Sequence, residues 1–238
     1  MKTELPPSLA VDYEAKQRDY FDRPRGEMLA FLPQSCRRVL DVGCGNGEFA
    51  AAVKAKLNCE AWGVEPSPKS ARFAVGRLDR VMEGCFNREL KLPLNYFDCI
   101  VFNDVLEHML DPGSALGQAR DLLTQDGVVV ASIPNIGHFP TVWRLVMKGQ
   151  WEYRNYGILD RTHLRFFTRK SIFKMFEGEN YEVERMRGIN AFSAEGPGDR
   201  KLWMLYRVLA LFPRASIRDM RYLQFATVAR QRRNPAQA

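Results

Sequence analysis

The sequence predicts an α/β protein whose core is a doubly wound, mostly parallel sheet of seven strands. Three observations predict this fold. Short apolar runs alternate with helix-like segments between residues 37 and 134, the first run ends in a cluster of glycines, and the last strand-like runs suggest a hairpin-like end. The chain has 238 residues, 46% of them hydrophobic and 26% charged, so it suits one elaborated domain and is too apolar to be mainly disordered.

Seven runs have the composition of strands. Those in the first half are mostly apolar, which is typical of strands buried on both faces of a parallel sheet, whereas the sixth alternates polar and apolar residues. The third run is weak, the fourth (FDCIVFN) is strong, and the fifth (GVVVASI) is ended by Pro134. In chain order, the expected strands cover residues 37–42, 61–64, 80–83, 97–103, 127–133, 181–187 and 222–229.

Segments with helix signals fill the spaces between these runs. The second begins with Ser67 and Pro68, and the third has Pro112 in its first turn, both of which are common at helix starts. Residues 1–36 add a helical arm that is interrupted by prolines. The other expected helices cover residues 48–57, 67–78, 111–124, 169–177 and 201–212.

The order of the elements divides the chain into three parts. Residues 1–36 form the arm, residues 37–134 form the core of the sheet, and residues 135–238 complete the sheet. Two stretches of the last part, 135–168 and 190–222, interrupt the alternation of strands and helices. We expect these two stretches to be lid insertions that bind the acceptor.

Composition and patterning exclude several classes of protein. The longest strongly apolar stretch, residues 202–212, contains Arg207 and is shorter than the roughly 20 residues that a membrane-spanning helix needs. The first residues have no apolar core of signal-peptide length. The five cysteines form no CxxC pair, which argues against a disulfide framework or a zinc site. We therefore expect a cytoplasmic protein with no transmembrane segment.

The formal charge of +7 is concentrated in two segments. Residues 139–170 hold seven Lys and Arg against two acidic residues, and residues 214–238 hold six Arg against one Asp. The rest of the chain is mildly acidic. No nucleic-acid partner is therefore expected, since the region of the glycines is not basic. The basic insertion instead favours an anionic small molecule, and the basic end of the chain is typical of a solvated tail.

The strongest functional signal is the segment VLDVGCGNGEFA, residues 39–50, in which a buried strand leads through a glycine-rich turn into a helix. Glycines at such a turn let the backbone approach a ligand closely. Glu48 replaces the last glycine of a dinucleotide-binding turn, and the Gly-Lys-Ser/Thr of a phosphate loop is absent. Asp41 and Glu48 disfavour a pyrophosphate, so the turn suits a cationic ligand. Glu65, at the end of the second strand, suits the two hydroxyls of a ribose.

Four segments, in the expected order, resemble the class I S-adenosylmethionine (SAM) dependent methyltransferases. They are LDVGCGNG (40–47), GVEPS (63–67), FDCIVFNDVLEHMLDP (97–112) and LLTQDGVVVASIPN (122–135). The resemblance covers about residues 40–190 and extends to a bacterial subset that modifies small molecules and glycans, and to ubiquinone-pathway O-methyltransferases. It implies the Rossmann-like methyltransferase fold, SAM as the cofactor and S-adenosylhomocysteine as its product.

The resemblance also implies a set of cofactor contacts. Asp41 would contact the SAM ammonium directly or through water, Glu65 would hold the ribose, and Asn103 would approach the methionine end. Many relatives accept the adenine amine with an Asp after the third strand, where this chain has Gly-Cys-Phe, so backbone groups of Cys85 or Phe86 would replace it. Alternatively, Asp41 only caps the turn. The remaining implied contacts are Gly43, Cys44, Gly45, Gly47 and Pro66, together with Tyr20 and Arg25 of the arm.

One cluster after the fourth strand, Asp104-x-x-Glu107-His108, resembles the Glu-x-x-Glu-His cluster of ubiquinone-pathway O-methyltransferases, which is associated with a divalent metal. Its residue types are suitable ligands. The pair Glu107-His108 also recurs in metal-free relatives, where it fixes the loop before Pro112. We favour the metal-free interpretation and assign no metal ligand, while His108 stays a candidate base.

A second cluster lies in GILDRTHLRFFTRKSI, residues 157–172, which resembles a bacterial subset linked to sugar, glycan or lipid-linked modification. His163 is a candidate base that removes a hydroxyl proton, and Asp160 would orient it. The alternative is that Asp160, His163 and Arg165 brace the insertion against the sheet. The candidate contacts to an anionic acceptor are Tyr156, Arg161 and Arg165.

Several target classes lack their signatures in this chain. The Asp/Asn-Pro-Pro-Tyr/Phe of adenine and glutamine N-methyltransferases is replaced by Asn-Asp-Val-Leu at 103–106. The cytosine-carbon enzymes need a nucleophilic Cys after a Pro, but Asn135 follows Pro134. The paired-glutamate loop of arginine-methylating enzymes is also missing. These target classes are therefore disfavoured.

The last expected helix carries a stripe of apolar side chains: Leu202, Leu205, Tyr206, Leu209 and Phe212. Such a stripe suits a lipid-linked substrate or a weak peripheral contact with a membrane, and it also suits a lid helix or a dimer contact. We favour the lid or dimer interpretation, and we expect a monomer or a homodimer.

The sequence therefore predicts a SAM-dependent methyltransferase that acts on a hydroxyl oxygen of a small-molecule, sugar, glycan or lipid-linked acceptor, which the basic insertion indicates is anionic. Two alternatives stay open. One is an N- or C-methyltransferase of a small metabolite, in which positioning replaces a dedicated base. The other is a SAM-binding partner protein without turnover of its own.

Overall fold

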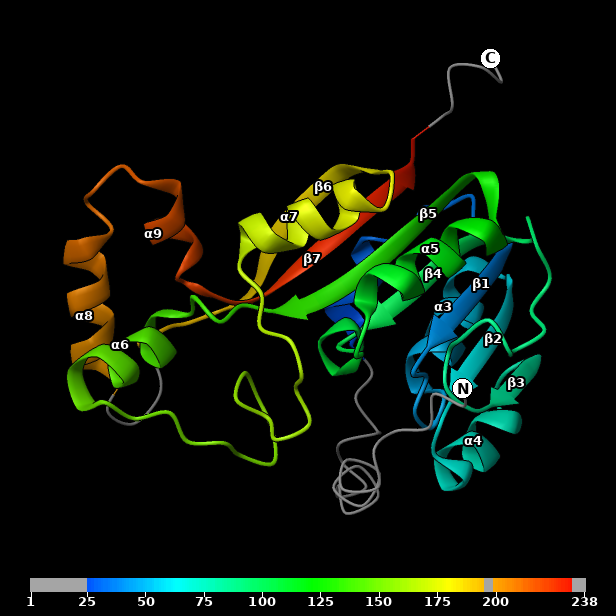
Figure 1. Ribbon diagram of the computed structural model, residues 1–238, viewed down its shortest axis with the longest axis horizontal. Coiled ribbons are helices and arrows are strands. Elements are labelled where there is room, and N and C mark those ends of the chain that lie inside the picture. Colours follow the sequence, from blue (N-terminus) through cyan, green and yellow to red (C-terminus); the bar gives the residue numbers. More distant parts are fainter. Residues whose placement is uncertain (1–24, 195–198, 233–238) are drawn as a thin grey trace.

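A seven-stranded sheet runs through the molecule, as the computed structural model in Figure 1 shows; the structure describes residues 25–194 and 199–232. The strand order is β3-β2-β1-β4-β5-β7-β6. The pairs from β3 to β5 are parallel, whereas β7 is antiparallel to both β5 and β6. The strands are β1 (Arg38–Val42), β2 (Glu60–Glu65), β3 (Arg80–Glu83), β4 (Phe97–Asn103), β5 (Leu123–Pro134), β6 (Tyr181–Ala191) and β7 (Tyr222–Gln231). This order confirms the predicted doubly wound, mostly parallel sheet.

Helices connect the strands on both sides of the sheet. The α-helices in the described part of the chain are α3 (Glu48–Leu57), α4 (Pro68–Val75), α5 (Pro112–Leu122), α6 (Phe139–Lys148), α7 (Arg169–Gly178), α8 (Asp199–Leu209) and α9 (Ala215–Asp219). Two short 3-10 helices are η1 (Gly26–Ala30) and η2 (Leu106–His108). Ser67 and Asp111 cap α4 and α5 through their side chains, as their positions before Pro68 and Pro112 predict.

The structure differs from the sequence-based expectation in several places, among them the last helix, expected over 201–212, which covers Asp199–Leu209, and the fifth and sixth strands, which are longer than expected. The helix expected over 67–78 ends at Val75. The helix expected to reach residue 124 ends at Leu122, because Leu123 already pairs with Phe97 before the strand bulges and resumes its pairing at Val128. The insertion expected over 135–168 contains α6, and the stretch 190–222 contains α9 besides the expected helix. Most of the expected arm, residues 1–24, lies outside the described residues.

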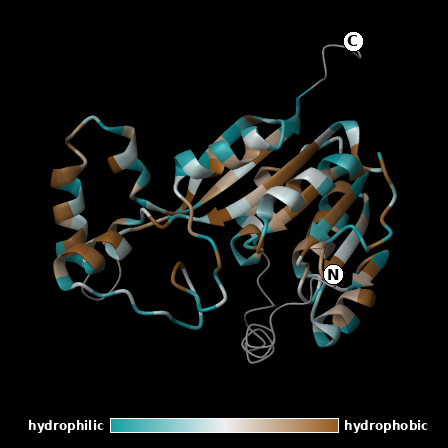
Figure 2. Cartoon of the chain, in the orientation of Figure 1, coloured by the Kyte–Doolittle hydropathy of each residue, from teal (hydrophilic) through white to brown (hydrophobic). Residues whose placement is uncertain are grey.

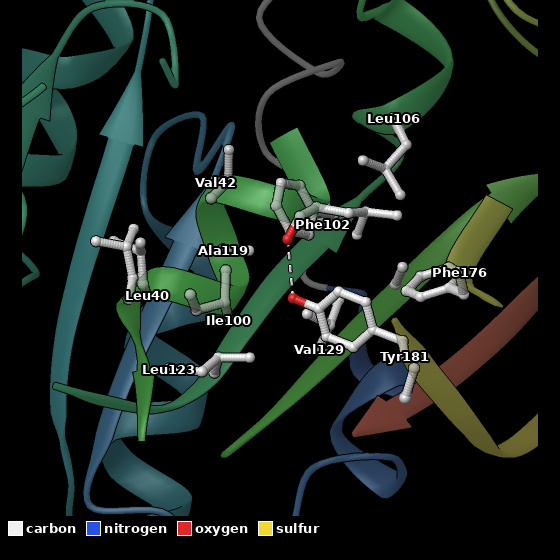
Figure 3. Packing of buried hydrophobic residues seen from close by; sticks show 14 of the residues in the cluster. Leu40, Val42, Ile100, Phe102, Leu106, Ala119, Leu123, Val129, Phe176 and Tyr181 are labelled. Carbon is white, nitrogen blue, oxygen red and sulfur yellow. Dashed lines mark hydrogen bonds between the residues drawn. The ribbon is translucent and has the colours of Figure 1, made fainter. Parts of the chain in front are cut away.

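The buried core has one large cluster on each face of the sheet. The larger cluster joins α5 and α7 to β1, β4 and β5, and Figure 3 shows its packing around Ile100, Phe102 and Val129. The hydroxyl of Tyr181 donates a hydrogen bond of 2.9 Å to the carbonyl of Leu116, drawn as the dashed line in Figure 3. The second cluster joins α3 and η1 to the other face. Packing by the two clusters on the two faces fixes the carboxyl ends of β1, β2 and β4 along one edge of the sheet.

A smaller apolar cluster forms beyond the end of the sheet. It consists of Phe139 from α6, Phe192 after β6 and Tyr206 from α8, with half-buried neighbours from α8 and the turn before β7. In Figure 1, α6, α8 and α9 lie together at the left, away from α3 and α4. The late part of the chain therefore completes the sheet and also builds a separate helical extension.

The contact between β2 and the glycine-rich turn leaves no room for a side chain at Gly63. A Cβ atom there would lie 2.5 Å from Cys44 Sγ and 2.8 Å from Leu78 Cδ1. We expect Gly63→Ala to lower the free energy of unfolding by about 1–3 kcal/mol, because both neighbours are buried and must shift. Urea unfolding checks this expectation.

Gly178→Ala is the matched control, since a Cβ atom at Gly178 meets nothing within 4 Å. Its effect should stay within about 0.5 kcal/mol. Equal stability of the two variants would contradict the close packing of the turn on β2.

Candidate functional site

The glycine-rich turn joins β1 to α3 and lies against the end of β2. The backbone N–H groups of Gly43 and Cys44 donate to the carbonyl of Val64, at 2.7 and 3.1 Å. Gly43, Gly45 and Gly47 all have positive φ, between 54° and 82°. Only glycine adopts this conformation without strain, so the glycines determine the path of the turn. At Gly43 a Cβ atom would also meet Val105 at 2.7 Å.

Glu65 connects this turn to the start of α4. One of its carboxylate oxygens accepts the N–H of Gly45 at 2.9 Å, and the other accepts the N–H of Ser67 at 2.8 Å. The residue has no solvent exposure. Burial raises the pKa of Glu65 to about 7, against the effect of the two N–H donors, which stabilise its charge. Each oxygen keeps a second lone pair, so the carboxylate can still accept hydroxyl groups of a ligand.

Asp41 lies at the carboxyl end of β1 and is 2% exposed. Within residues 25–194 and 199–232, its carboxylate accepts no hydrogen bond. Burial, and then the charge of Glu65, raise the pKa of Asp41 to about 8. A buried carboxylate with no donor is costly unless a ligand supplies one. The pair Asp41 and Glu65 therefore makes a site for a cation that also carries hydroxyl groups.

Asn103, the last residue of β4, is a second polar residue with a buried side chain. Both its Oδ1 and its Nδ2 are buried, and in the part of the chain that the structure describes neither has a hydrogen-bond partner. Asn103 follows the strand that pairs directly with β1, in a register that sets Val42 against Phe102. Unsatisfied polar groups thus occur at the carboxyl ends of two neighbouring strands, which is where α/β sheets bind their ligands.

The segment after β3, expected to receive an adenine, is half-buried. Gly84 has a φ of 141° and donates its N–H to the carbonyl of Glu65 at 3.0 Å. Cys85 and Phe86 are both half-buried, and the Phe86 ring meets the Phe102 ring edge-on at 5.7 Å. Pro66 is also half-buried, next to Glu65. An aromatic side chain therefore follows β3, whose end pairs with Glu65.

Arg25 reaches the end of β4 from the segment before η1. Its guanidinium forms an ion pair with Asp104 and donates to Ser132 Oγ at 2.9 Å. Gln224 Nε2 donates to the same Asp104 carboxylate at 2.7 Å, and Asn190 donates to Gln224 at 2.8 Å. The network joins β4, β5, β6 and β7 to the chain segment that precedes the sheet. Arg25 was expected to contact the cofactor, whereas the structure describes its contacts with Asp104 and Ser132. Tyr20 lies outside the described residues.

Glu107, His108 and His163 form a compact cluster. One donor atom from each lies within 4.8 Å of the others. His163 Nε2 is 3.9 Å from Glu107 Oε1, and the two imidazole rings meet edge-on at 4.7 Å. Asp104 of the predicted Asp-x-x-Glu-His cluster lies elsewhere, held by Arg25. The motif that suggested a metal therefore divides into two parts in the fold.

Asp160 acts on this cluster through Thr162. Its carboxylate accepts the N–H of Thr162 at 2.9 Å and the Thr162 hydroxyl at 2.8 Å. His108 Nδ1 in turn lies 3.0 Å from both the hydroxyl and the carbonyl of Thr162. Because a carbonyl only accepts, Nδ1 of His108 carries the proton and Nε2 is left with its lone pair. By the same argument, His163 Nδ1 donates to the carbonyl of Ile158 at 2.9 Å, so its Nε2 faces Glu107 unprotonated when the ring is neutral.

The insertion is attached to η2 through backbone hydrogen bonds. The N–H groups of Leu164 and Arg165 both donate to the carbonyl of Glu107, at 2.8 and 3.0 Å. The Arg165 side chain donates to the carbonyl of Leu110 at 2.6 Å. These contacts fit the bracing interpretation of Arg165. Arg161 is exposed and Tyr156 is 62% exposed, so both are accessible to a ligand.

The remaining histidine, His138, precedes α6. Burial, and then the charge of Arg144, lower the pKa of His138 to about 4. A base works best when its pKa lies near the working pH, so His138 is poorly suited to the role. His108 and His163 remain the candidate bases at this edge of the sheet.

Sequence reasoning missed the partners that secure this site. Ser132, Gln224 and Asn190 carry no motif, and they meet their partners because β7 lies between β5 and β6. Thr162 meets His108 because the insertion returns to η2. The one available signal was Thr162 between Asp160 and His163, since a Thr two residues after an Asp often closes a local turn.

Comparison with known proteins agrees with this geometry. The profile of a methyltransferase domain family matches residues 13–185. The ubiquinone biosynthesis O-methyltransferase of Cereibacter sphaeroides is 30% identical over 133 residues, which cover 52% of this chain and 51% of that protein. That of Yersinia enterocolitica is 32% identical over 105 residues, or 42% and 43% of the two chains. The chain thus spans about half the length or less of these curated relatives.

Solved structures match over a larger share of the chain. A SAM-dependent methyltransferase from Archaeoglobus fulgidus has a TM-score of 0.65 at 18% identity and covers 95% of this chain and all of its own. The 1,6-didemethyltoxoflavin-N1-methyltransferase of Burkholderia thailandensis, solved with S-adenosylhomocysteine, has a TM-score of 0.60 at 14% identity, covering 95% and 86%. At these identities the likeness concerns the fold. Together with the family match over most of its length, it shows that this chain belongs to the class I SAM-dependent methyltransferases.

Proposed function

We propose that the chain transfers a methyl group from SAM to a hydroxyl oxygen of an anionic small-molecule, sugar, glycan or lipid-linked acceptor. The observation that carries the cofactor half is the buried Asp41 carboxylate, which has no donor within the described residues and lies beside Glu65. The names of the curated relatives support oxygen as the atom methylated. The exposed basic residues of the insertion support an anionic acceptor.

The residues at the strand ends suit the parts of SAM. Asp41 would accept the ammonium, Glu65 would accept the ribose hydroxyls, and Asn103 would meet the methionine end with its free amide. Gly43, Cys44, Gly45 and Gly47 would line the methionine as backbone, with Pro66, Cys85 and Phe86 beside the adenine. When bound, SAM supplies an electrophilic methyl group that is displaced in line, so the protein's task is alignment and removal of a proton.

The cluster after β4 supplies the candidate base. His163 Nε2 faces Glu107, which would stabilise the imidazolium once a hydroxyl proton has been taken up. Asp160 holds Thr162, and Thr162 holds His108, so the second imidazole is oriented from the insertion. Arg161 and Tyr156, exposed on the same insertion, would contact the acceptor. A nitrogen or carbon acceptor would leave this cluster a purely structural role.

We also propose a cytoplasmic enzyme that works as a monomer or homodimer without nucleic acid. The five cysteines are free, which suits a reducing compartment. None of the helices in residues 25–194 and 199–232 is long and apolar enough to cross a membrane. Cell fractionation with an antibody against the chain tests the compartment.

The affinity for SAM should rise with pH. Burial raises the pKa of Asp41 and Glu65 to about 8 and about 7, and a cation binds their ionised forms. Binding therefore expels protons, and the affinity should increase at least roughly tenfold between about pH 6 and 7.5. Isothermal calorimetry in buffers of different ionisation enthalpy measures both the affinity and the proton release.

Asp41→Asn should weaken SAM binding by about 1–3 kcal/mol and flatten the pH dependence. Glu48→Gln is the matched control, because Glu48 lies in the same turn but is paired with Arg77 at the surface. Its affinity should stay within about threefold of wild type. An unchanged affinity in Asp41→Asn would remove Asp41 from the site.

His163→Ala should slow methyl transfer by roughly 100-fold or more if His163 is the base. The assay follows methyl release from labelled SAM over a panel of hydroxylated anionic acceptors. SAM affinity should be unchanged, and the acidic limb of the pH–rate profile should disappear with the imidazole.

Thr162→Val separates this role from bracing, because it removes the hydroxyl bonds to Asp160 and His108 but keeps both imidazoles and the backbone bonds of residue 162. If His163 only braces the insertion, both variants should lower the melting temperature and the rate together. Full activity of His163→Ala would rule out the base, and SAM binding without turnover of any acceptor by wild type would favour a SAM-binding partner protein.

Activity should persist in the presence of a chelator. The ion pair with Arg25 holds Asp104 away from the cluster, so the acidic residue that completes the metal-associated motif is not available there. Dialysis against a chelator, followed by the methyl-release assay, checks this. A loss of activity that added Mg²⁺, Mn²⁺ or Zn²⁺ restores would instead assign Glu107, His108 and His163 as ligands.

A further inference from the structure

The helical extension beyond the sheet has an apolar inner side. Phe139 of α6 and Tyr206 of α8 meet with ring centroids 5.5 Å apart, and Trp203 stacks on Tyr206 at 5.5 Å. Leu202 and Leu209 are half-buried against the same cluster. The inner half of the predicted stripe on α8 is therefore used to hold α8 on α6.

The outer side of the same helices is also apolar but lies in solvent. Val146 is 71% exposed, Val208 is 61% exposed and Leu211 is 80% exposed. In Figure 2 brown segments alternate along α8, at the left end of the molecule. We call this set the α6–α8 outer face: Leu145, Val146 and Met147 from α6, with Met204, Leu205, Val208, Leu211 and Phe212 from α8 and the residues after it.

Most of the large apolar side chains that the structure exposes lie in this extension and the insertion beside it. Exposed apolar residues gathered on neighbouring helices mark an interaction surface more often than scattered ones do. They leave α8 apolar on both sides, as is expected of a helix that has a partner on the outside as well, and they extend to the end of α6.

Positive charges predominate beside this face: the acidic residues of α8 and α9 are Asp199 and Asp219, and Asp219 is paired with Arg169. Residues 139–149 and 200–218 contain seven Arg and Lys and no Asp or Glu. All seven are exposed: Arg144, Lys148, Arg200, Lys201, Arg207, Arg214 and Arg218. Helices that combine exposed Leu, Val, Met and Phe with such a cationic border suit the interface of a bilayer with anionic headgroups.

The same charges disfavour a second copy of the chain as the occupant. A two-fold contact through this face would set the cationic border of one copy near that of the other. Like charges brought together in a contact oppose it. An anionic lipid surface has the opposite sign and satisfies both the apolar residues and the cations.

We propose that the α6–α8 outer face binds the surface of a membrane that contains anionic phospholipid. The apolar side chains enter the headgroup boundary, and the seven cations pair with lipid phosphates. This reverses the preference for a lid or dimer contact that the sequence alone favoured for the stripe. The proposal does not depend on which atom the enzyme methylates, because it concerns side chains outside the cofactor site.

Vesicle co-sedimentation of the full chain tests the proposal. Wild type should bind vesicles with about one-third phosphatidylglycerol at least roughly tenfold more tightly than pure phosphatidylcholine vesicles, and high salt should weaken this binding. The double variant Val208→Glu/Leu211→Glu should lose roughly tenfold or more of the affinity for the anionic vesicles. Calorimetry with SAM shows whether the variant is folded, since its cofactor site is intact.

Val75→Glu/Leu94→Glu is the matched control. It makes the same change in charge and apolarity at two residues that are 63% and 68% exposed on other parts of the surface. This variant should bind the anionic vesicles within about threefold of wild type. A comparable loss in both double variants would mean that only net charge matters and would overturn the proposed surface.

Two further outcomes would overturn it. One is wild-type chain that stays in the supernatant with anionic vesicles. The other is a dimer, seen by light scattering, that Val208→Glu/Leu211→Glu dissociates, which would assign the face to a second copy.

Discussion

Two buried carboxylates at neighbouring strand ends are the constraint on which the site depends. Glu65 accepts the N–H groups of Gly45 and Ser67 and thereby fixes the glycine turn against the start of α4. Asp41 is buried beside it and accepts no hydrogen bond within the described residues, so burial and then the charge of Glu65 raise the pKa of Asp41. In the proposed function, the cationic cofactor compensates for the cost of burying these two groups. The glycine turn also packs closely against Gly63, and this contact likewise fixes the turn.

The edge that we propose as the acceptor site is assembled from distant parts of the chain. The carbonyl of Glu107 accepts two N–H groups of the insertion, and Asp160 reaches His108 through Thr162. Arg25 joins the segment before the sheet to Asp104 at the end of β4. The insertion is thus held at one side of the β4 end and the N-terminal segment at the other. The same hydrogen bonds orient the two imidazoles, so bracing and proton transfer are compatible roles for one cluster.

The helical extension carries part of the local basic charge of the chain. Its inner side is held together by aromatic packing around Tyr206, and its outer side combines apolar residues with a majority of cations. The cofactor site, in contrast, depends on negative charge. One chain thus separates an anionic pocket for a cationic cofactor from a cationic surface for an anionic partner.

The sequence by itself determined the alternation of strands and helices, the glycine turn and the positions of Asp41, Glu65 and Asn103, because these depend on local periodicity and on residues close together in the chain. The tertiary structure decided which of the chemical groups meet. It set Asp104 on Arg25, placed Glu107 and His108 beside His163, and divided the α8 stripe into a buried and an exposed half. The network around Asp104 depends on β7 lying between β5 and β6, and the imidazole cluster depends on the insertion returning to η2. The division of the α8 stripe depends on the packing of α8 on α6. Such long-range contacts leave no periodic trace in the sequence, since each is made by one side chain with a partner far along the chain.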